Sequence, residues 1–347
     1  MRIATGLAGN HPGDWEGAAT FAAEAERLGV ASVSSAEAWG SDAITPLAFI
    51  AARTASIGLM TGIMQVGART PAMVAMTAAG MQSVSDGRFI LGLGTSGPQV
   101  IEGWHGVPFD RPLQRTRELI EVVRLAGSGE RLEYHGQVIE LPLPGGQGRA
   151  IRSTAGEFEV PIYLAALGPR NLELTGELCD GWIGTSFIPE TADVFFDRIR
   201  TGAERAGRAL DDIDLQVPVT VEFGEDVDEV AKRHARGYAF TFGAMGSRTD
   251  NFYLNALARQ GYADEGREIQ RLWLDGKREE AADRVPVELA HKTNLLGTDD
   301  LILDRLRVYR DAGVNTLRAG VRGESVAERI ANLGRLIDLV ATVDAER

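Results

Sequence analysis

Cysteine is almost absent from this sequence of 347 residues, which contains Cys179 alone. One cysteine cannot form a disulfide within the chain, and it cannot supply the several thiolates of a zinc or iron–sulfur centre. This scarcity is typical of a protein from a reducing compartment. We therefore expect Cys179 to be a buried structural thiol. The first residues, MRIATGLAG, start like a strand and lack the apolar core of a signal peptide, so a cytoplasmic location is predicted.

Clusters of positive charge are lacking as well. The chain has 36 Lys and Arg against 49 Asp and Glu, for a net charge of −13, and it contains no basic run. Nucleic-acid backbones and anionic membrane surfaces attract proteins through clustered Lys and Arg side chains. The sequence therefore predicts neither partner.

Uninterrupted hydrophobic runs and metal-ligand spacings are missing too. Residues 43–68 are fairly apolar, but Pro46, Arg53, Gly58 and Gly62 interrupt them. Their period changes midway, which indicates a helix followed by a strand rather than a membrane span. Four histidines have no metal-ligand spacing with acidic neighbours: His11, His135, His234 and His291. No metal site is predicted.

Three strand-like segments, by contrast, end in residues with almost no side-chain bulk. They are IGLMTGIMQV at 57–66, RFILGLGTSG at 88–97 and VPIYLAALGPRN at 160–171. The C-terminal ends of parallel strands in α/β folds are where ligands bind. The sequence therefore predicts a shared pocket with room for something flat, and Thr95 and Ser96 are expected to form hydrogen-bonding edges of it.

Strand and helix patterns alternate along the chain without an intervening hairpin in the first half, which favours parallel strands with right-handed crossovers. We predict a single TIM barrel, an α/β fold, covering residues 1–347, with a hairpin insertion near 127–159 and a polar helical insertion near 226–290. Eight barrel strands are expected at 3–7, 30–37, 57–65, 89–94, 160–165, 181–185, 215–222 and 314–321.

Five motifs occur in an order that resembles the bacterial luciferase-like superfamily, specifically its branch that uses the deazaflavin coenzyme F420 and includes methylenetetrahydromethanopterin reductase-like proteins. They lie at residues 36–54, 61–75, 87–109, 161–183 and 295–317. The resemblance implies that the tricyclic ring of F420 sits across the C-terminal ends of the strands, with its side chain running toward the loop after the fifth strand. It also implies a homodimer and a small-molecule substrate.

The resemblance assigns the cofactor-binding positions to four short segments. It implies a bulge with a non-prolyl cis peptide at Gly62-Ile63, although an ordinary barrel bulge is an alternative. The expected cofactor residues are Glu37; Thr61, Gly62, Ile63 and Met64; Thr95, Ser96 and Gly97; and Ala165, Ala166, Leu167, Gly168, Pro169 and Arg170. The last group precedes a helix whose N-terminus favours a phosphate. A plain strand-to-helix turn is the alternative there.

Six side chains are candidates for chemistry or substrate contact. Glu37 ends the second strand, where it is predicted to transfer a proton or accept a hydrogen bond, unless it only caps the next helix. His105 is the best histidine for a proton donor, and a locally bonded loop histidine is its alternative. Trp39 and Trp104 are expected to form flat walls of the pocket, or else to belong to the core. Arg318 and Arg322 are expected to recognise a phosphate or carboxylate, or else to be surface charges.

Two departures from the resemblance narrow the expected chemistry. The sugar-phosphate dehydrogenases of the family place a histidine and a glutamate where this sequence has Ala38 and Gly97. Alcohol oxidation lacks its acid/base pair here, so reduction of a C=C, C=N or pterin-like bond is favoured. The predicted function is an F420-dependent oxidoreductase that transfers a hydride at C5 of the deazaflavin. An FMN-dependent monooxygenase and a non-catalytic flavin-binding protein are the alternatives.

Overall fold

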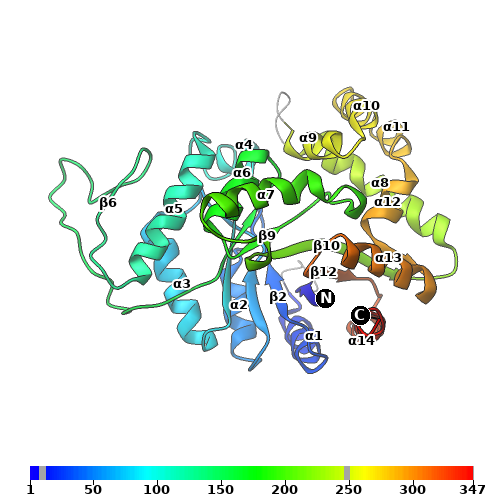
Figure 1. Ribbon diagram of the computed structural model, residues 1–347, viewed down its shortest axis with the longest axis horizontal. Coiled ribbons are helices and arrows are strands. Elements are labelled where there is room, and N and C mark those ends of the chain that lie inside the picture. The colour runs from blue at the N-terminus through cyan, green and yellow to red at the C-terminus, as the bar shows by residue number, and fades with distance from the viewer. Residues whose placement is uncertain (8–12, 246–250, 347) are drawn as a thin grey trace.

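The computed structural model describes residues 1–7, 13–245 and 251–346. Eight parallel strands form a closed ring, in which each strand pairs with two neighbours and β9 pairs with β10 to complete the circle. The predicted TIM barrel is confirmed (Figure 1). In ring order the strands are β1 (Arg2–Gly6), β2 (Ser32–Ser35), β3 (Gly58–Thr61), β5 (Phe89–Gly94), β8 (Ile162–Ala165), β9 (Gly181–Ile183), β10 (Asp214–Phe223) and β12 (Thr316–Val321). His11 lies outside the described residues.

Eight helices surround the ring. The side chains of each strand alternate between these helices and the barrel interior: Leu317 and Ala319 of β12 join the main core, whereas Arg318 and Gly320 line an inner cavity. The surrounding helices are α1 (Trp15–Arg27), α2 (Ile44–Ala51), α3 (Pro71–Ser85), α5 (Pro112–Gly127), α6 (Pro169–Leu178), α7 (Asp193–Arg205), α13 (Asp299–Asp311) and α14 (Val326–Asp344).

Local signals in the sequence set several helix boundaries. Asp14 accepts the Gly17 backbone N–H (2.9 Å) and so caps the start of α1. Asp42 accepts the N–H groups of Ile44 and Thr45 (2.8 Å each), so it caps α2 from just outside the helix. The 3₁₀ turn η1 (Pro189–Thr191) precedes α7. A second 3₁₀ turn, η2 (Leu210–Asp212), leads into β10.

The third barrel strand is interrupted. The sequence predicted one strand over 57–65, but β3 ends at Thr61 and β4 (Met64–Gln65) follows after the cis peptide Gly62-Ile63. The implied cis peptide is therefore present. Thr61 Oγ1 donates to the Gly92 carbonyl and accepts the Gly92 N–H (2.8 Å each). A side chain thus supplies the hydrogen bonds to β5 where the regular ladder stops.

Two segments extend beyond the ring. The first contains the antiparallel pair β6 (Tyr134–His135) and β7 (Glu140–Leu141) and forms the arm that projects from the body beyond α5 (Figure 1). The second is helical, with α8 (Val227–Ala244), α9 (Phe252–Arg259), α10 (Ala263–Leu274), α11 (Arg278–Asp283) and α12 (Val287–Thr293). This helical segment has a hydrophobic core of its own, which includes Phe242, Ile269 and Leu289.

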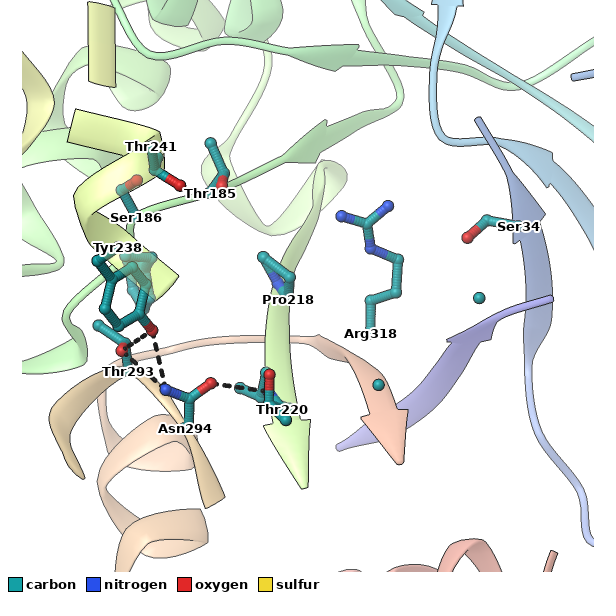
Figure 2. A pocket seen from close by; sticks show the side chains of 14 residues that line it. Ser34, Thr185, Ser186, Pro218, Thr220, Tyr238, Thr241, Thr293, Asn294 and Arg318 are labelled. Carbon is teal, nitrogen blue, oxygen red and sulfur yellow. Dashed lines mark hydrogen bonds between the residues drawn. The ribbon is translucent and has the colours of Figure 1, made fainter. Parts of the chain in front are cut away.

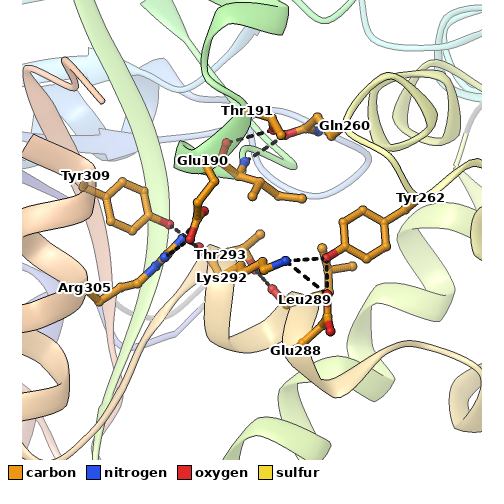
Figure 3. A network of polar contacts seen from close by, with 11 residues as sticks. Glu190, Thr191, Gln260, Tyr262, Glu288, Leu289, Lys292, Thr293, Arg305 and Tyr309 are labelled. Atoms are coloured by element: carbon orange, nitrogen blue, oxygen red, sulfur yellow. Dashed lines mark hydrogen bonds and ion pairs between the residues drawn. The ribbon is translucent and has the colours of Figure 1, made fainter. Parts of the chain in front are cut away.

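A polar network fastens the helical segment to the barrel (Figure 3). Gln260 accepts the Ile188 N–H (2.8 Å) and donates to the Ser186 carbonyl (2.6 Å). Arg305 of α13 bonds to Glu190 (2.8 Å from Nη2) and to the carbonyl of Lys292. The end of α12 and the loop after β9 are therefore held in fixed positions beside the barrel mouth.

Two short elements were not predicted from the sequence. β11 (Leu295–Gly297) pairs with the C-terminal end of β10, outside the ring of eight. α4 (Pro98–Ile101) follows directly after the glycine-rich loop of β5. Elements of three and four residues are too short for their hydrophobic period to be read.

Candidate active site at the mouth of the barrel

A cavity of about 870 Å³ opens at the C-terminal ends of the strands. It is lined by the three small-residue strand ends and by the first parts of the loops that follow them, and the helical segment covers it from the other side. The lining residues from the strand ends are Ile63; Gly94, Thr95, Ser96 and Gly97; and Ala165, Ala166, Leu167, Gly168, Pro169 and Arg170. The structure therefore brings together nine of the loop residues predicted from the sequence, and Ile63 with them, whereas Gly94 was not among the predicted positions.

The floor of this cavity is apolar because a side chain lies across a glycine. A Cβ at Gly94 would stand 2.8 Å from Ile63 Cγ1, so only glycine leaves room for that isoleucine. Below the floor, Met60, Tyr163 and Ile183 form a buried cluster inside the barrel, with Ile63 packed against it. A flat aromatic ring fits such a surface better than a polar group does.

The other residues of the bulge lie behind the cavity. Thr61 and Met64 are fully buried and do not line it, and Thr61 is engaged with β5. Gly62 faces Ser34 and Arg318, since a Cβ there would be 3.0 Å from Arg318 Nη1. Of the four bulge positions predicted to bind the cofactor, Ile63 alone reaches the cavity.

The far end of the cavity meets the N-terminus of α6. Gly168 is the N-cap without a side-chain hydrogen bond to the helix, so the first-turn N–H groups are open to a ligand. Asn171 lines the cavity beside them, and its buried Oδ1 has no hydrogen-bond partner. Arg259 of α9 donates to the Leu167 carbonyl (2.6 Å), and its pKa is lowered by burial and by the nearby Arg198. This end of the cavity suits an anionic group.

Glu37 lines the cavity, but its carboxylate is already occupied. It accepts the backbone N–H groups of Ala43 (3.2 Å) and Gln65 (3.1 Å), and it forms an ion pair with Arg69 (2.6 Å). Its side chain is 7% exposed. These bonds tie the loop between β2 and α2 to β4, so the geometry favours a positioning role over proton transfer.

Replacement of Glu37 tests that distinction. Glu37→Gln removes the charge that faces Arg69, so we expect the free energy of unfolding to fall by about 2 kcal/mol. Urea unfolding measures this, with Glu16→Gln as control, because Glu16 is largely exposed and meets Arg53 at 3.4 Å. If Glu37→Gln left stability unchanged and abolished hydride transfer, Glu37 would be the proton-transfer group.

The remaining candidates are divided between the cavity and the surface. His105 is exposed and does not line the cavity; its Nε2 lies 2.6 Å from Gln65 Oε1, and Gln65 Nε2 donates to the Ala38 carbonyl (3.0 Å). The imidazole of His105 thus contacts Gln65, and its backbone N–H donates to the carbonyl of the lining residue Val100 (3.1 Å). Trp39 lines the cavity, whereas Trp104 does not and is 65% exposed.

The two arginines at the end of the last strand, Arg318 and Arg322, lie in different environments. Arg318 projects into a second, smaller cavity that adjoins the first. Arg322 is exposed and lines neither cavity; its backbone N–H donates to the Val221 carbonyl (2.9 Å). The alternation of β12 places only every second residue inside the barrel, and Arg322 lies past its end.

The covering side of the cavity comes from the helical insertion that the sequence predicted, but the sequence did not show which of its residues line the cavity. That side consists of Phe240, Ala244, Met245, Phe252 and Tyr253, from α8 and the start of α9. Phe252 and Tyr253 stand out in the sequence as aromatics within a polar helical region. Phe242 shares that composition signal, yet it is buried in the helical core. Composition therefore identifies the segment that covers the site, but not which of its aromatic residues face it.

Few titratable groups line the cavity. Among the described residues they are Glu37, Arg170 and Tyr253, and burial raises the pKa of Tyr253. Ala38 and Gly97 both line the cavity, so the two positions noted from the sequence add no acid or base there. Cys179 is buried as predicted, and burial raises the pKa of its thiol to about 12.

The described residues contain neither a metal-binding cluster nor a membrane-spanning helix. No group of three or more His, Cys, Asp or Glu side chains within residues 1–7, 13–245 and 251–346 is placed to hold a metal ion. Over the same residues, no helix has both the length and the apolar character that crossing a membrane requires.

A barrel with a cis-peptide bulge and an apolar mouth cavity defines a luciferase-like protein, and comparison with known proteins agrees. The family model for luciferase-like monooxygenases matches residues 2–316. The chain belongs to this family, so the predicted resemblance is confirmed.

Similar proteins indicate which branch of the family this chain resembles. A putative coenzyme F420-dependent oxidoreductase of Mycobacterium tuberculosis is 36% identical over 328 residues, covering 92% of this chain and 94% of that protein. A 5,10-methylenetetrahydromethanopterin reductase of Methanolobus tindarius is 30% identical over 279 residues, covering 80% and 82% respectively. These relatives come from the branch that the motifs indicated.

Solved structures show the same fold. The coenzyme F420-dependent tetrahydromethanopterin reductase of Methanopyrus kandleri superposes with a TM-score of 0.76 at 22% identity, over 96% of this chain and 97% of that one. An F420-dependent secondary alcohol dehydrogenase in complex with an F420-acetone adduct gives a TM-score of 0.74 at 18% identity, over 98% of both chains. At this identity the likeness shows the fold alone.

Proposed function

We propose that the protein is an F420-dependent oxidoreductase that transfers a hydride between C5 of the deazaflavin and a small organic substrate. The observation that carries the proposal is the 870 Å³ cavity, with Ile63 laid over Gly94 as its floor and the N-terminus of α6 at its far end. One apolar face and one anion-binding end are what a flat ring with a phosphorylated side chain requires. The 36% identical relative named for F420 supports the choice of cofactor.

The residues present fit this cofactor on physical grounds. The cavity volume lies within the range of about 300–1,000 Å³ that is usual for ligand sites. The buried, unpartnered Asn171 Oδ1 and the first-turn N–H groups of α6 offer hydrogen bonds that the protein itself leaves unmade. Thr95 and Ser96 add hydroxyl groups at the edge of the floor.

The residues of this chain would orient the bound molecules and exclude water, and they offer few acid or base groups. When bound, F420 supplies the hydride chemistry. Ile63 would support one face of the ring, and Phe252 and Tyr253 of α9 would exclude water from the opposite side. Reduction of a C=C or C=N bond takes one hydride and one proton, and we propose that solvent supplies the proton once the cavity opens to it. Glu37 holds the loop that carries Ala38 and Trp39.

The small number of acid and base groups in the cavity also disfavours alcohol oxidation. It requires a base close to the substrate hydroxyl, within hydrogen-bond reach. Ala38 and Gly97 supply none, and the carboxylate of Glu37 is shared among Ala43, Gln65 and Arg69. Reduction of a C=C, C=N or pterin-like bond is therefore the proposed direction.

Parallel titrations test the choice of cofactor. Fluorescence quenching with F420 and with FMN should give a dissociation constant at least about tenfold lower for F420, which corresponds to about 1.4 kcal/mol. Preferential binding of FMN, with oxygen uptake when reduced FMN is supplied, would instead make the protein a monooxygenase. Tight binding without turnover over a panel of unsaturated substrates would make it a binding protein.

We also propose that the protein is a homodimer in the cytoplasm. Helix α3 presents an exposed apolar face formed by Met73 (51% exposed), Met76 (66%) and Val84 (60%). These positions lie on one side of the helix, with Gly80 between them. An apolar face of this kind marks an interaction site, and a twofold dimer pairs the same face on both copies.

Size-exclusion chromatography with light scattering tests the dimer. The wild type should elute as a dimer, and Met76→Asp should weaken it by at least about tenfold, because a charge is placed in an apolar interface. Leu274→Asp is the matched control, since Leu274 is exposed to 43% but lies on α10 of the helical segment. A monomeric wild type, or a dimer that survives Met76→Asp unchanged, would contradict the proposed interface.

A further inference from the structure

A second cavity, of about 370 Å³, adjoins the first at Thr185, which lines both. Its walls are the C-terminal ends of β1, β2, β10 and β12, together with α8 and the segment after α12 (Figure 2). In contrast to the apolar floor formed by Ile63, this side of the barrel mouth is polar. The polar lining residues are Ser34, Thr185, Ser186, Thr220, Tyr238, Thr241, Thr293, Asn294 and Arg318.

Arg318 is the only charged residue among the described residues that line this cavity. Within the described part of the chain its guanidinium makes one long hydrogen bond, from Nη1 to the Gly62 carbonyl (3.4 Å), and no ion pair. A guanidinium offers five N–H donors, so most of its hydrogen-bonding capacity is unused. Burial also lowers the pKa of Arg318, which shows how little compensation the protein gives this cation.

Both carboxylates of the paired strand β10 are committed elsewhere, and Glu222, near its end, pairs with Arg233 and with His234 (2.7 Å). Asp214, at the start of β10, bonds to Arg2 (2.8 Å), Thr316 (2.8 Å) and Tyr163 (2.9 Å) at the opposite end of the barrel. Along β12, Thr316 faces that acidic residue, and Arg318 lies one inward position closer to the mouth. A buried cation without a counter-charge is costly, and natural proteins pair such groups.

The space beside Arg318 is kept open by small residues. Ala4 of β1 is its register partner, and Gly6 follows at the next inward position. A Cβ added at Gly6 would meet no atom within 4 Å. The guanidinium therefore faces a volume that side chains of β1 do not fill.

The opposite wall is rigid and hydrogen-bonded. Asn294 Oδ1 accepts the Thr220 N–H (3.0 Å), and its Nδ2 donates to the Tyr238 hydroxyl (2.8 Å). Thr293 Oγ1 lies 2.5 Å from the same hydroxyl (Figure 2). The network around Lys292 and Arg305 holds this end of α12 against the barrel. The cavity is thus built before any ligand enters.

We propose that this cavity binds the carboxylate of an organic acid, with Arg318 as the counter-charge. The inference rests on the proposed function and deepens it, because the shared edge at Thr185 lets one molecule place its carboxylate at Arg318 and its reducible bond above the Ile63 floor. A single arginine matches one negative charge, and its planar guanidinium suits a carboxylate. The substrate class is an unsaturated organic acid.

Calorimetric titration of the full chain tests the site with two probes of matched shape, trans-cinnamate and the neutral trans-cinnamamide. Cinnamate should bind once per chain, with a dissociation constant at least about tenfold below that of the amide, because a charge-assisted hydrogen bond distinguishes them. Arg318→Gln should remove this preference, and Arg318→Lys should keep part of it. Arg322→Gln is the matched control and should keep all of it, since Arg322 lines neither cavity.

A second variant keeps the test valid if Arg318→Gln does not fold. Gly6→Leu keeps the charge but fills the open volume, and it should lower cinnamate affinity by at least about tenfold. Equal affinity for the two probes, unchanged cinnamate binding in Arg318→Gln, or an effect of Arg318→Gln on F420 binding alone would each overturn the proposal.

F420 titrations on the same samples separate this inference from the proposed function. If the wild type prefers cinnamate through Arg318 but does not bind F420, the anion site stands and the F420 assignment fails. If F420 binds and the Arg318-dependent preference is absent, the F420 assignment stands and the anion site is refuted.

Discussion

Gly92→Ala should destabilise the protein by about 3–5 kcal/mol, a large share of the stability of a typical domain. A Cβ at this position would lie 1.8 Å from the backbone oxygen of Thr61, and a backbone atom of a paired barrel strand cannot swing aside as a side chain does. The two hydrogen bonds between Thr61 Oγ1 and the Gly92 backbone would break as the strands separate.

The damage should reach the cofactor site. Thr61 directly precedes the bulge that carries Ile63, so a displaced β3 moves the cavity floor. We expect Gly92→Ala to lower the urea midpoint strongly and to weaken F420 binding in the fraction that remains folded. Far-UV circular dichroism during urea unfolding and F420 quenching measure the two effects.

Gly97→Ala is the matched control for this experiment. A Cβ at Gly97 would meet only the far end of Gln99, at 3.6 Å, and Gly97 has the extended backbone (φ −139°) that any residue adopts. Its free energy of unfolding should change by less than about 0.5 kcal/mol. Equal urea midpoints for the two variants would show that β3 and β5 yield at Gly92, and the close-approach argument would fail.

The fold and the location of the site follow from local patterns. Alternation of strand and helix gave the barrel, because a parallel strand and its crossover helix each carry their own hydrophobic period. The small residues near the three strand ends marked the mouth: a Cβ at Gly62 or Gly94 would crowd Arg318 or Ile63, whereas a Cβ at Gly97 or Gly168 would crowd no atom. Both signals are local in sequence, so one chain suffices to find them.

The role of a side chain was harder to predict from the sequence where it depends on contacts with residues far away along the chain. Glu37 was predicted to transfer a proton or accept a hydrogen bond, or else only to cap the next helix. Its contacts with Ala43 at the start of α2 and with Arg69, 32 residues away, favour the last of these. His105 was chosen by residue type, and only the path of the chain around α4 shows that it turns toward Gln65 rather than into the cavity. Residue type alone indicates what a side chain is able to do, whereas its neighbours in space decide whether it does it.

The position of Arg318 inside the barrel also depends on its neighbours in space. Its sequence position left surface charge and ligand recognition as equal alternatives. The inward register of β12, opposite Ala4 and Pro218, places it inside the barrel. Arg322, four residues later, is exposed. The two arginines would share a face if the strand continued, so they are separated by the end of β12 at Val321, which one sequence does not specify.

Gly94→Val should weaken F420 binding by about 10- to 100-fold while it leaves most of the stability intact. The new Cβ would stand 2.8 Å from Ile63 Cγ1 and 3.0 Å from its Cδ1, and Ile63 is a side chain that can move into the cavity. The strain of overpacking, about 1–3 kcal/mol, is then paid mostly when the ring binds. Gly94→Val and Gly92→Ala thus differ in where the clash falls: on a side chain at the floor or on the backbone beneath it.

A double-mutant cycle makes this prediction specific to the floor. Ile63→Ala removes the side chain that Gly94→Val displaces, so the double variant should bind F420 at least about fivefold more tightly than Gly94→Val alone. Fluorescence quenching gives the four dissociation constants, and urea unfolding shows whether each variant is folded. If Ile63→Ala did not relieve the effect, the two residues would act independently, and the ring would not rest on Ile63. Because that side chain stands between β3 and the cavity, the height at which it holds a ligand also sets how far the reducible bond of a substrate anchored at Arg318 lies from the ring.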